Sequence, residues 1–148
     1  METTLIIAIY GAVLSTIALL WNIIIRIRDR PKLVPKYSTG FLQWGHGLHP
    51  IFSITITNPT KYKIKLVSIE IHFKNGQKMI LVDSGDNLPK EIFPLDNHTV
   101  YRDIQKIKQA IDEQGEPDYI LVRDATDRKY KGSTQRMVSH VNALCNSI

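Results

Sequence analysis

Residues 5–25 read LIIAIYGAVLSTIALLWNIII, a stretch with no charged side chain and one strongly polar residue, Asn22. About 20 apolar residues in a helix, at ~1.5 Å rise per residue, match a bilayer core roughly 30 Å thick. A helix of this length in a soluble domain normally carries a polar stripe, and this stretch has none. The sequence therefore predicts a transmembrane helix over residues 5–25, after a short extracytoplasmic tail over residues 1–4.

The charges on either side of this helix predict its orientation. The tail METT contains Glu2 and no basic side chain, whereas residues 26–36 form a basic juxtamembrane linker. Because basic residues beside a span stay in the cytoplasm, we expect the N-terminus outside and the rest of the chain in the cytoplasm, at the cell (inner) membrane. The expected contacts with the lipid bilayer, worth ~1 kcal/mol each near anionic headgroups, are Arg26, Arg28, Arg30 and Lys32.

The positive charge of the chain is concentrated in this linker. Of the net +5, residues 26–36 supply +4, because five basic side chains stand against Asp29 alone. Residues 37–148 hold 14 basic and 12 acidic side chains, so the main domain is nearly balanced and no nucleic-acid partner is predicted. The long apolar core and the acidic start disfavour a cleaved signal peptide. Cys145 is the single cysteine, which excludes an intrachain disulfide framework.

The domain over residues 37–148 carries mainly strand patterns. Apolar residues at 52, 54 and 56 alternate with polar ones, a strand over 62–73 changes parity near Val67-Ser68, and Asn75-Gly76 predicts a type I′ hairpin turn. We expect an edge strand over 33–37, a loop over 38–50 and a central strand over 119–122.

Helical spacing is limited to two places. Ile104, Ile107 and Ile111 predict one amphipathic helix, with Asp103 as its N-cap and Gly115 just past its end. A weaker helix is expected near the C-terminus. About six or seven short strands with one crossover helix favour an immunoglobulin-like β-sandwich, with a small β-barrel as the alternative.

Four features stand together in this chain: the N-terminal span, the junction Asp29–Lys32, a strand ending in Thr57-Asn58, and a late hairpin at Arg123-Asp124. In this order they resemble small single-pass bacterial membrane proteins with an immunoglobulin-like cytosolic domain and no assigned activity. The resemblance implies the fold and the location, and it transfers no catalytic residue.

Catalytic and metal-binding patterns are weak. Residues 81–85 read LVDSG, which looks like the catalytic turn of retropepsin-like aspartic proteases, with Asp83 as the candidate aspartate. The downstream apolar-apolar-Gly segment of that family is missing from Tyr119–Arg123. His46 and His49 are three residues apart without a cysteine or acidic ligand nearby. We therefore predict no enzyme activity, no catalytic residue, no metal site and no cofactor.

Two surfaces remain as candidates for binding. The apolar residues of the expected loop are possible partner contacts: Phe41, Leu42, Trp44 and Leu48. Small residues on the span form small-xxx-small pairs for helix–helix packing: Ala8, Gly11, Ala12 and Ser15. The sequence thus favours a membrane-anchored cytosolic binding or adaptor module that assembles through its span and meets a protein partner or a second copy. The alternatives are a ligand-sensing membrane effector with a β-barrel receptor domain and the retropepsin-like protease.

Overall fold

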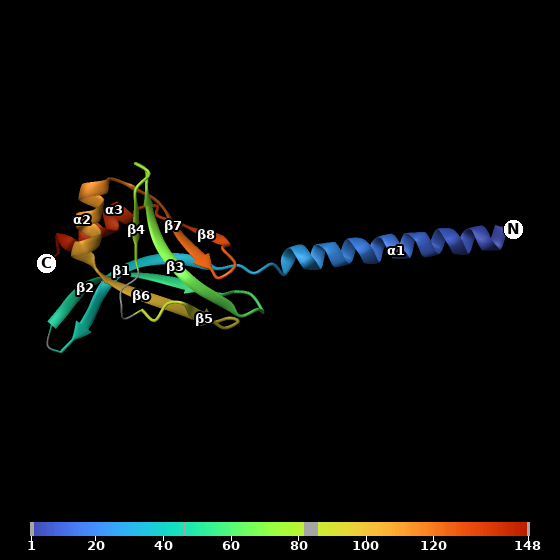
Figure 1. Ribbon diagram of the computed structural model, residues 1–148, viewed down its shortest axis with the longest axis horizontal. Helices are drawn as coiled ribbons and strands as arrows, with labels where there is room; N and C mark the ends of the chain where they lie inside the picture. The colour runs from blue at the N-terminus through green and yellow to red at the C-terminus, as the bar shows by residue number, and fades with distance from the viewer. Residues whose placement is uncertain (1, 46, 82–85, 148) are drawn as a thin grey trace. The chain divides into compact units, whose positions relative to one another are not determined.

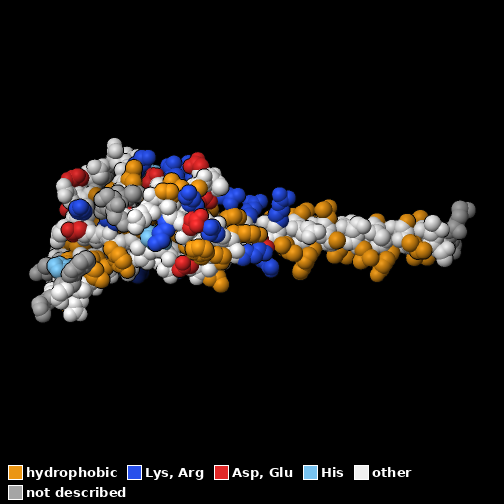
Figure 2. Space-filling model, turned by 60° about the horizontal axis from the view of Figure 1, so that its bottom comes forward, with side chains coloured by type: hydrophobic (Ala, Val, Ile, Leu, Met, Phe, Trp, Pro, Cys, Tyr) orange, Lys and Arg blue, Asp and Glu red, His pale blue; other side chains and the backbone are white. Residues whose placement is uncertain are grey.

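The computed structural model describes residues 2–45, 47–81 and 86–147 (Figure 1). It consists of two compact units, residues 1–31 and residues 32–148. The first unit contains helix α1 (Glu2–Arg28). Thr3–Arg28 reaches a mean hydropathy of 2.1, and hydrophobic side chains follow its whole length in Figure 2. The predicted helix is therefore confirmed as long and apolar enough to span a membrane.

The second unit is built from two antiparallel sheets. One sheet has the order β1-β2-β6, and the other has the order β4-β3-β7-β8 with β5 also paired to β3. Within the described ranges no ladder joins the two sheets into a barrel, so the mainly β, two-sheet sandwich is confirmed. The elements are β1 (Val34–Trp44), β2 (Gly47–Thr57), β3 (Ile64–Phe73), β4 (Lys78–Ile80), β5 (Lys90–Ile92), β6 (Asn97–Asp103), α2 (Ile104–Gln114), β7 (Pro117–Asp124), β8 (Lys129–Ser133) and α3 (Met137–Cys145).

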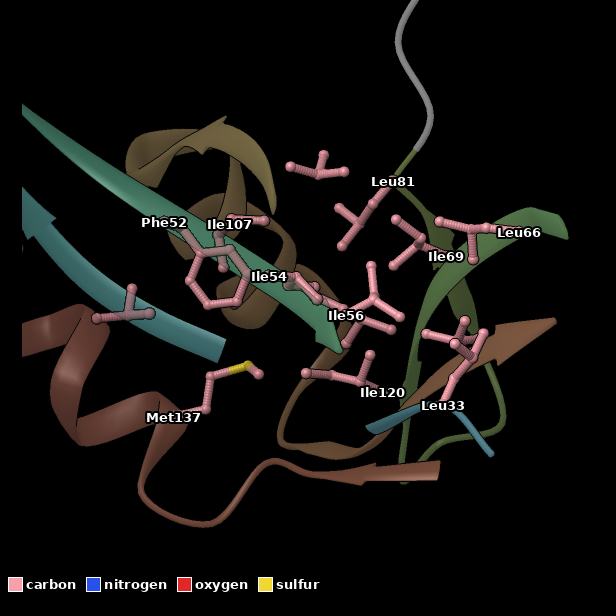
Figure 3. Packing of buried hydrophobic residues seen from close by; sticks show 14 of the residues in the cluster. Leu33, Phe52, Ile54, Ile56, Leu66, Ile69, Leu81, Ile107, Ile120 and Met137 are labelled. Atoms are coloured by element: carbon pink, nitrogen blue, oxygen red, sulfur yellow. The ribbon is translucent and has the colours of Figure 1, made fainter. Parts of the chain in front are cut away.

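The core lies between the two inner sheet faces and continues under the two helices (Figure 3). Alternate residues of β2 and β3 point inward, as strand periodicity requires. Helix α2 contributes its three isoleucines, and α3 contributes Met137 and Val141. Leu33, just before β1, is 2% exposed and belongs to the same cluster. The chain is therefore anchored in the core within the predicted linker, whose last three residues, 34–36, already belong to β1.

Helix α2 begins and ends where the local chemistry predicts. The Asp103 carboxylate accepts a hydrogen bond from the backbone N–H of Gln105 at 2.8 Å. Gly115 follows the helix with φ 87°, and its N–H bonds to the Ile111 carbonyl. Both end caps supply hydrogen-bond partners to backbone groups that have none within the helix, so the predicted helix is confirmed.

The parity change in β3 is confirmed as a register shift between Leu66 and Ser68. This bulge lets Leu66 and Ile69 both face the core although they are an odd number of residues apart. The hairpin at Asn75-Gly76 is also confirmed, but the predicted type I′ turn is wrong. Only Gly76 has positive φ, at 86°, and its N–H bonds to Phe73, as in a three-residue loop rather than type I′.

The prediction of a loop over residues 38–50 is wrong. β1 and β2 form one long hairpin, paired from Val34 with Thr57 to Trp44 with Gly47. The glycines that suggested a loop are tolerated because the cross-strand ladder supplies hydrogen bonds that sequence patterns do not reveal. Gly45, with φ 61°, is the position in this stretch that needs a glycine conformation.

The edges of the two sheets meet where β8 crosses β1. Gly132 is buried there, and an added Cβ would lie 2.6 Å from the Pro35 carbonyl oxygen. A side chain at this position would push the strands apart. Pro35 fits an edge strand because it has no N–H to offer a ladder, which confirms the prediction of an edge strand at the start of β1.

Candidate functional site

The end of the β1–β2 hairpin extends past the rest of its sheet. β6 pairs with β2 only as far as Ile51, which faces Asp103. Beyond that point, Phe41 to Trp44 pair with Gly47 to Pro50 as a two-stranded ribbon. We call residues 41–50 the arm. Figure 1 shows the arm at the opposite end of the sandwich from β5.

The arm displays apolar side chains on both of its faces. Leu48 is 67% exposed, Phe41 47% and Leu42 37%. Phe41 and Leu48 occupy the same face in the pairing register, and Leu42 occupies the other. The backbone of Trp44 pairs with Gly47, and its side chain lies outside the described residues. The structure therefore brings together three of the four predicted partner contacts on an exposed ribbon.

A shallow cleft of about 530 Å³ lies where the arm leaves the sheet. Its walls are largely apolar, and the Arg102 guanidinium lies at one side, held by an ion pair with Asp86. An apolar side chain from a partner fits such a mixed surface. The lining residues are Leu42, His49, Pro50, Ile51, Tyr101, Arg102, Asp103 and Gln105.

The basic linker begins inside α1. Arg26 and Arg28 lie in its last turn, where positive charge is favourable at the negative end of the helix dipole. Arg28 is 4.0 Å from the Asp29 carboxylate. Arg30 and Lys32 are exposed, as the two helix arginines are. All four predicted headgroup contacts are therefore accessible, and their contact with lipid stays a prediction.

The small residues of the span lie on an open part of α1. No atom comes within 4 Å of a Cβ added at Gly11. The Ser15 hydroxyl donates to the Gly11 carbonyl at 2.8 Å, so its polar group is already satisfied within the helix. The helix–helix packing predicted for these residues and for Ala8 and Ala12 stays a prediction.

A network that the sequence reading missed lies on the outer face of the β3–β7 sheet. Glu70 is 4% exposed, and its carboxylate is 2.9 Å from His72 Nε2. Arg123 Nε is 3.5 Å away and Lys78 Nζ 3.9 Å away, both as ion pairs, and the Arg123 Nε–H lacks hydrogen-bond geometry. The alternation of Ser68, Glu70 and His72 opposite the buried isoleucines is the signal that marks this polar face.

The electrostatics of this network keep Glu70 ionised. Burial raises the pKa of Glu70, but the hydrogen bond from His72 and the charges of Arg123 and Lys78 outweigh it and hold the pKa below its usual value. The His72 ring stacks on Tyr119 at 4.8 Å, and the Lys131 ammonium lies 4.0 Å from the Tyr119 ring centre. These contacts tie β3, β4, β7 and β8 together, which is a stabilising role.

The weak catalytic and metal patterns receive no structural support. Asp83 and His46 lie outside the described residues, so the protease turn and the histidine pair stay untested. Among the residues that the structure does describe, no group of three or more His, Cys, Asp or Glu side chains is placed to hold a metal ion. His49 lies on β2 and Cys145 on α3.

Comparison with known proteins adds little. No family model matches the sequence, and no curated protein matches it. Among solved structures, the chain is similar to "X-ray structure of Northeast Structural Genomics Consortium target SoR45", with 12% identity over 68% of this chain and 80% of that chain, at a TM-score of 0.33. A score this low carries no argument. The resemblance to small single-pass bacterial membrane proteins therefore stays a prediction.

Proposed function

We propose that this protein is a membrane-anchored binding module of the immunoglobulin-like kind, which engages a protein partner through the arm. Its helix spans the cell membrane with the N-terminus outside, and its sandwich lies in the cytoplasm. The observation that carries the proposal is the exposed apolar ribbon: in the described part of the chain, no third strand pairs with the residues that carry Phe41, Leu42 and Leu48. The module acts by binding, with no catalytic step and no nucleic-acid partner.

Burial of the exposed apolar side chains of the arm would favour binding of a partner. A two-stranded ribbon is marginally stable alone in water, and full burial of a leucine or phenylalanine side chain is worth about 1.5–3 kcal/mol. A partner that covers Phe41 and Leu48 therefore gains from burial and stiffens the ribbon at once. Exposed apolar patches of this kind mark interaction surfaces.

The edge of the arm also favours one kind of partner. In the described part of the chain β1 pairs with β2 alone, so its outer edge has open backbone groups. Pro35 interrupts that edge near the start of β1, whereas residues 41–44 contain no proline. An extended partner segment with alternating apolar residues can thus add as a strand along residues 41–44. Small residues on the span support assembly of the anchored chains.

The arm contact is tested by photo-crosslinking of the full chain in native membranes. A photoreactive residue replaces Leu48, and a matched control replaces Ile80, which is similarly exposed at 57%. We expect a discrete adduct from position 48, absent from position 80 and lost when Phe41→Ser is added. An adduct of twice the 16.9 kDa chain mass identifies a second copy, and any other mass identifies a different partner. Identical adducts from both positions, or none, contradict the proposal.

The orientation is tested by thiol labelling in intact cells. Thr3→Cys and Asp112→Cys are introduced separately in a Cys145→Ser background, because Cys145 is the native thiol. An impermeant maleimide is expected to label position 3 at once and position 112 only after permeabilisation. Immediate labelling of position 112 contradicts a cytoplasmic domain.

A further inference from the structure

A second apolar surface lies at the other end of the sandwich. We call residues 58–63 and 93–96 the proximal rim, because Val34, the first residue after the linker anchor, pairs with Thr57 beside it. Three rim side chains face water: Leu95 is 83% exposed, Phe93 55% and Tyr62 45%. Figure 2 shows hydrophobic side chains interspersed with lysine and arginine side chains at this end of the domain.

Asn58 fastens the two rim loops to each other. Its side chain is fully buried, and its amide donates to the carbonyl oxygens of Tyr62 at 2.7 Å, Ile92 at 3.0 Å and Phe93 at 3.2 Å. Its side-chain oxygen accepts from the backbone N–H and the hydroxyl of Thr60, at 3.1 and 2.7 Å. The backbone of Asn58 also exchanges hydrogen bonds with Leu95 and Asp96. The exposed apolar tips are therefore held in fixed positions.

Leu95 occupies a turn position at which a leucine contributes nothing to the stability of the fold. The Asp96 N–H bonds to the Phe93 carbonyl at 3.2 Å, which closes a turn with Pro94 second and Leu95 third. Leu95 has φ 60°, and a turn with positive φ at its third residue normally has glycine or asparagine there. A leucine pays a steric penalty in this conformation and gains no burial, since 83% of it is exposed. Its apolar side chain is thus best explained by a contact outside the domain.

The charges beside these tips suit an anionic surface. The Lys61 ammonium lies 5.7 Å from the Tyr62 ring centre, and Lys63 lies 5.5 Å from that of Phe93. Lys63 also pairs with Glu91 at 2.8 Å. Apolar and aromatic tips flanked by lysines are typical of segments that rest in the bilayer interface, with the rings at headgroup level and the ammonium groups outward.

The short linker limits how far the start of the sandwich can lie from the end of α1. Helix α1 ends at Arg28, and Leu33 is already buried in the core. The chain between them, at ~3.3–3.6 Å per residue, reaches at most about 18 Å. A tether of this length gives a high effective concentration, so a weak surface contact is sufficient.

From these observations we infer that the proximal rim docks on an anionic lipid bilayer. Leu95 and Phe93 insert at the boundary between headgroups and acyl chains, Tyr62 lies at headgroup level, and Lys61 and Lys63 meet lipid phosphates. The inference rests on the membrane anchoring in the proposed function and is independent of the arm and its partner. Docking fixes the sandwich so that β1 leads away from the bilayer toward the arm.

The test measures lipid contact in the full chain, reconstituted in vesicles of phosphatidylcholine with ~30% phosphatidylglycerol. A fluorophore is attached to cysteine at position 95, 48 or 80 in the Cys145→Ser background, and a lipid-borne quencher is added. We expect quenching at 95 to exceed that at 48 and 80 several-fold, and to fall in pure phosphatidylcholine. Equal quenching at the three positions overturns the docking. Equal quenching in both lipid compositions overturns the role of the lysines.

A second variant separates docking from folding. With the fluorophore at Ala125, whose N–H bonds to the Lys65 carbonyl near the rim, Leu95→Asn is expected to lower quenching at least twofold. Its thermal midpoint should be unchanged or higher, because asparagine adopts positive φ readily. Leu95→Gly, also suited to this φ, is expected to behave in the same way. Unchanged quenching in both variants overturns the proposal. Loss of the arm adduct with quenching retained disproves only the partner binding.

Discussion

The arm and the proximal rim both expose large apolar side chains, yet they are built differently. The rim is fastened by the buried Asn58, whose side chain makes five hydrogen bonds. The arm is held by its own ladder, and no third strand among the residues that the structure describes pairs with it. A fixed surface loses little conformational entropy when it is covered, whereas a ribbon can adjust to the shape of a protein partner.

The two regions also differ in their distance from the linker. The rim adjoins the first paired residue of β1, and the arm occupies the far end of that strand of 11 residues. At ~3.4 Å per residue this separation is about 34 Å. The β1–β2 hairpin thereby connects the end of the sandwich at which the rim lies with the arm.

The largest effect that would test this comparison is at Asn58. Asn58→Ala leaves several buried carbonyl groups without their donor, and we expect a loss of about 3 kcal/mol in unfolding free energy. Chemical denaturation of the full chain in detergent measures it. Asn97→Ala, at an exposed asparagine of β6, is the matched control and should change stability by less than about 0.5 kcal/mol. Similar effects from the two variants would show that the rim is not fastened by Asn58.

Acid should loosen the end of the domain that carries the rim before it loosens the arm. Burial raises the pKa of Asp124, but hydrogen bonds from the Thr126 and Tyr130 hydroxyls and from the backbone outweigh it and hold the pKa below its usual value. A carboxyl group with a lowered folded-state pKa contributes stability that is present above pH ~4 and is lost as pH falls through the folded value. The arm sequence FLQWGHGLHP has no acidic residue.

Hydrogen exchange between pH 6 and 3 checks this expectation. After correction for intrinsic rates, amides of the β7–β8 hairpin should lose protection in acid. The exchange rates of the arm amides relative to those of β2 residues 51–57 should stay constant. Asp124→Asn should reduce this pH dependence, leaving the part that Glu70 contributes, and Asp118→Asn, at an exposed position, should leave it unchanged. Equal acid sensitivity in the arm would count against the assignment to Asp124.

Local signals made part of this structure predictable. Helix α2 follows from Asp103 and the isoleucine spacing because its hydrogen bonds connect neighbours. The arm was mistaken for a loop because its glycines suggest a turn, while the pairing that overrides them joins residues across the hairpin. Asn58 was predicted only as the end of a strand, but its partners Ile92 and Phe93 lie 34 and 35 residues away. No pattern in the sequence reports a contact over that distance.

The same limit applies to the two surfaces. The apolar residues of the arm were predicted as partner contacts from their residue types alone. Their exposure could not be predicted, because an exposed and a buried short apolar run have the same sequence pattern. The positive φ of Leu95 emerges from the fold and not from a pattern in the sequence. The Glu70 network needs two strands that are about 50 residues apart to pair, which only the sheet topology provides.

The smallest expected effect concerns the arm. Phe41→Ser combined with Leu48→Ser should change unfolding free energy by less than about 1 kcal/mol, because both side chains are already about half or more exposed, at 47% and 67%. Leu66→Ser, at a position with no exposure, is the contrasting control and should cost more than about 3 kcal/mol. Denaturation of the three proteins in the same detergent gives both values. A photoreactive residue at Leu42 should give the partner adduct in the otherwise unchanged chain and no adduct in the double variant. If it instead unfolds as early as Leu66→Ser, then Phe41 and Leu48 support the core, and the arm is not a free surface to be compared with the rim.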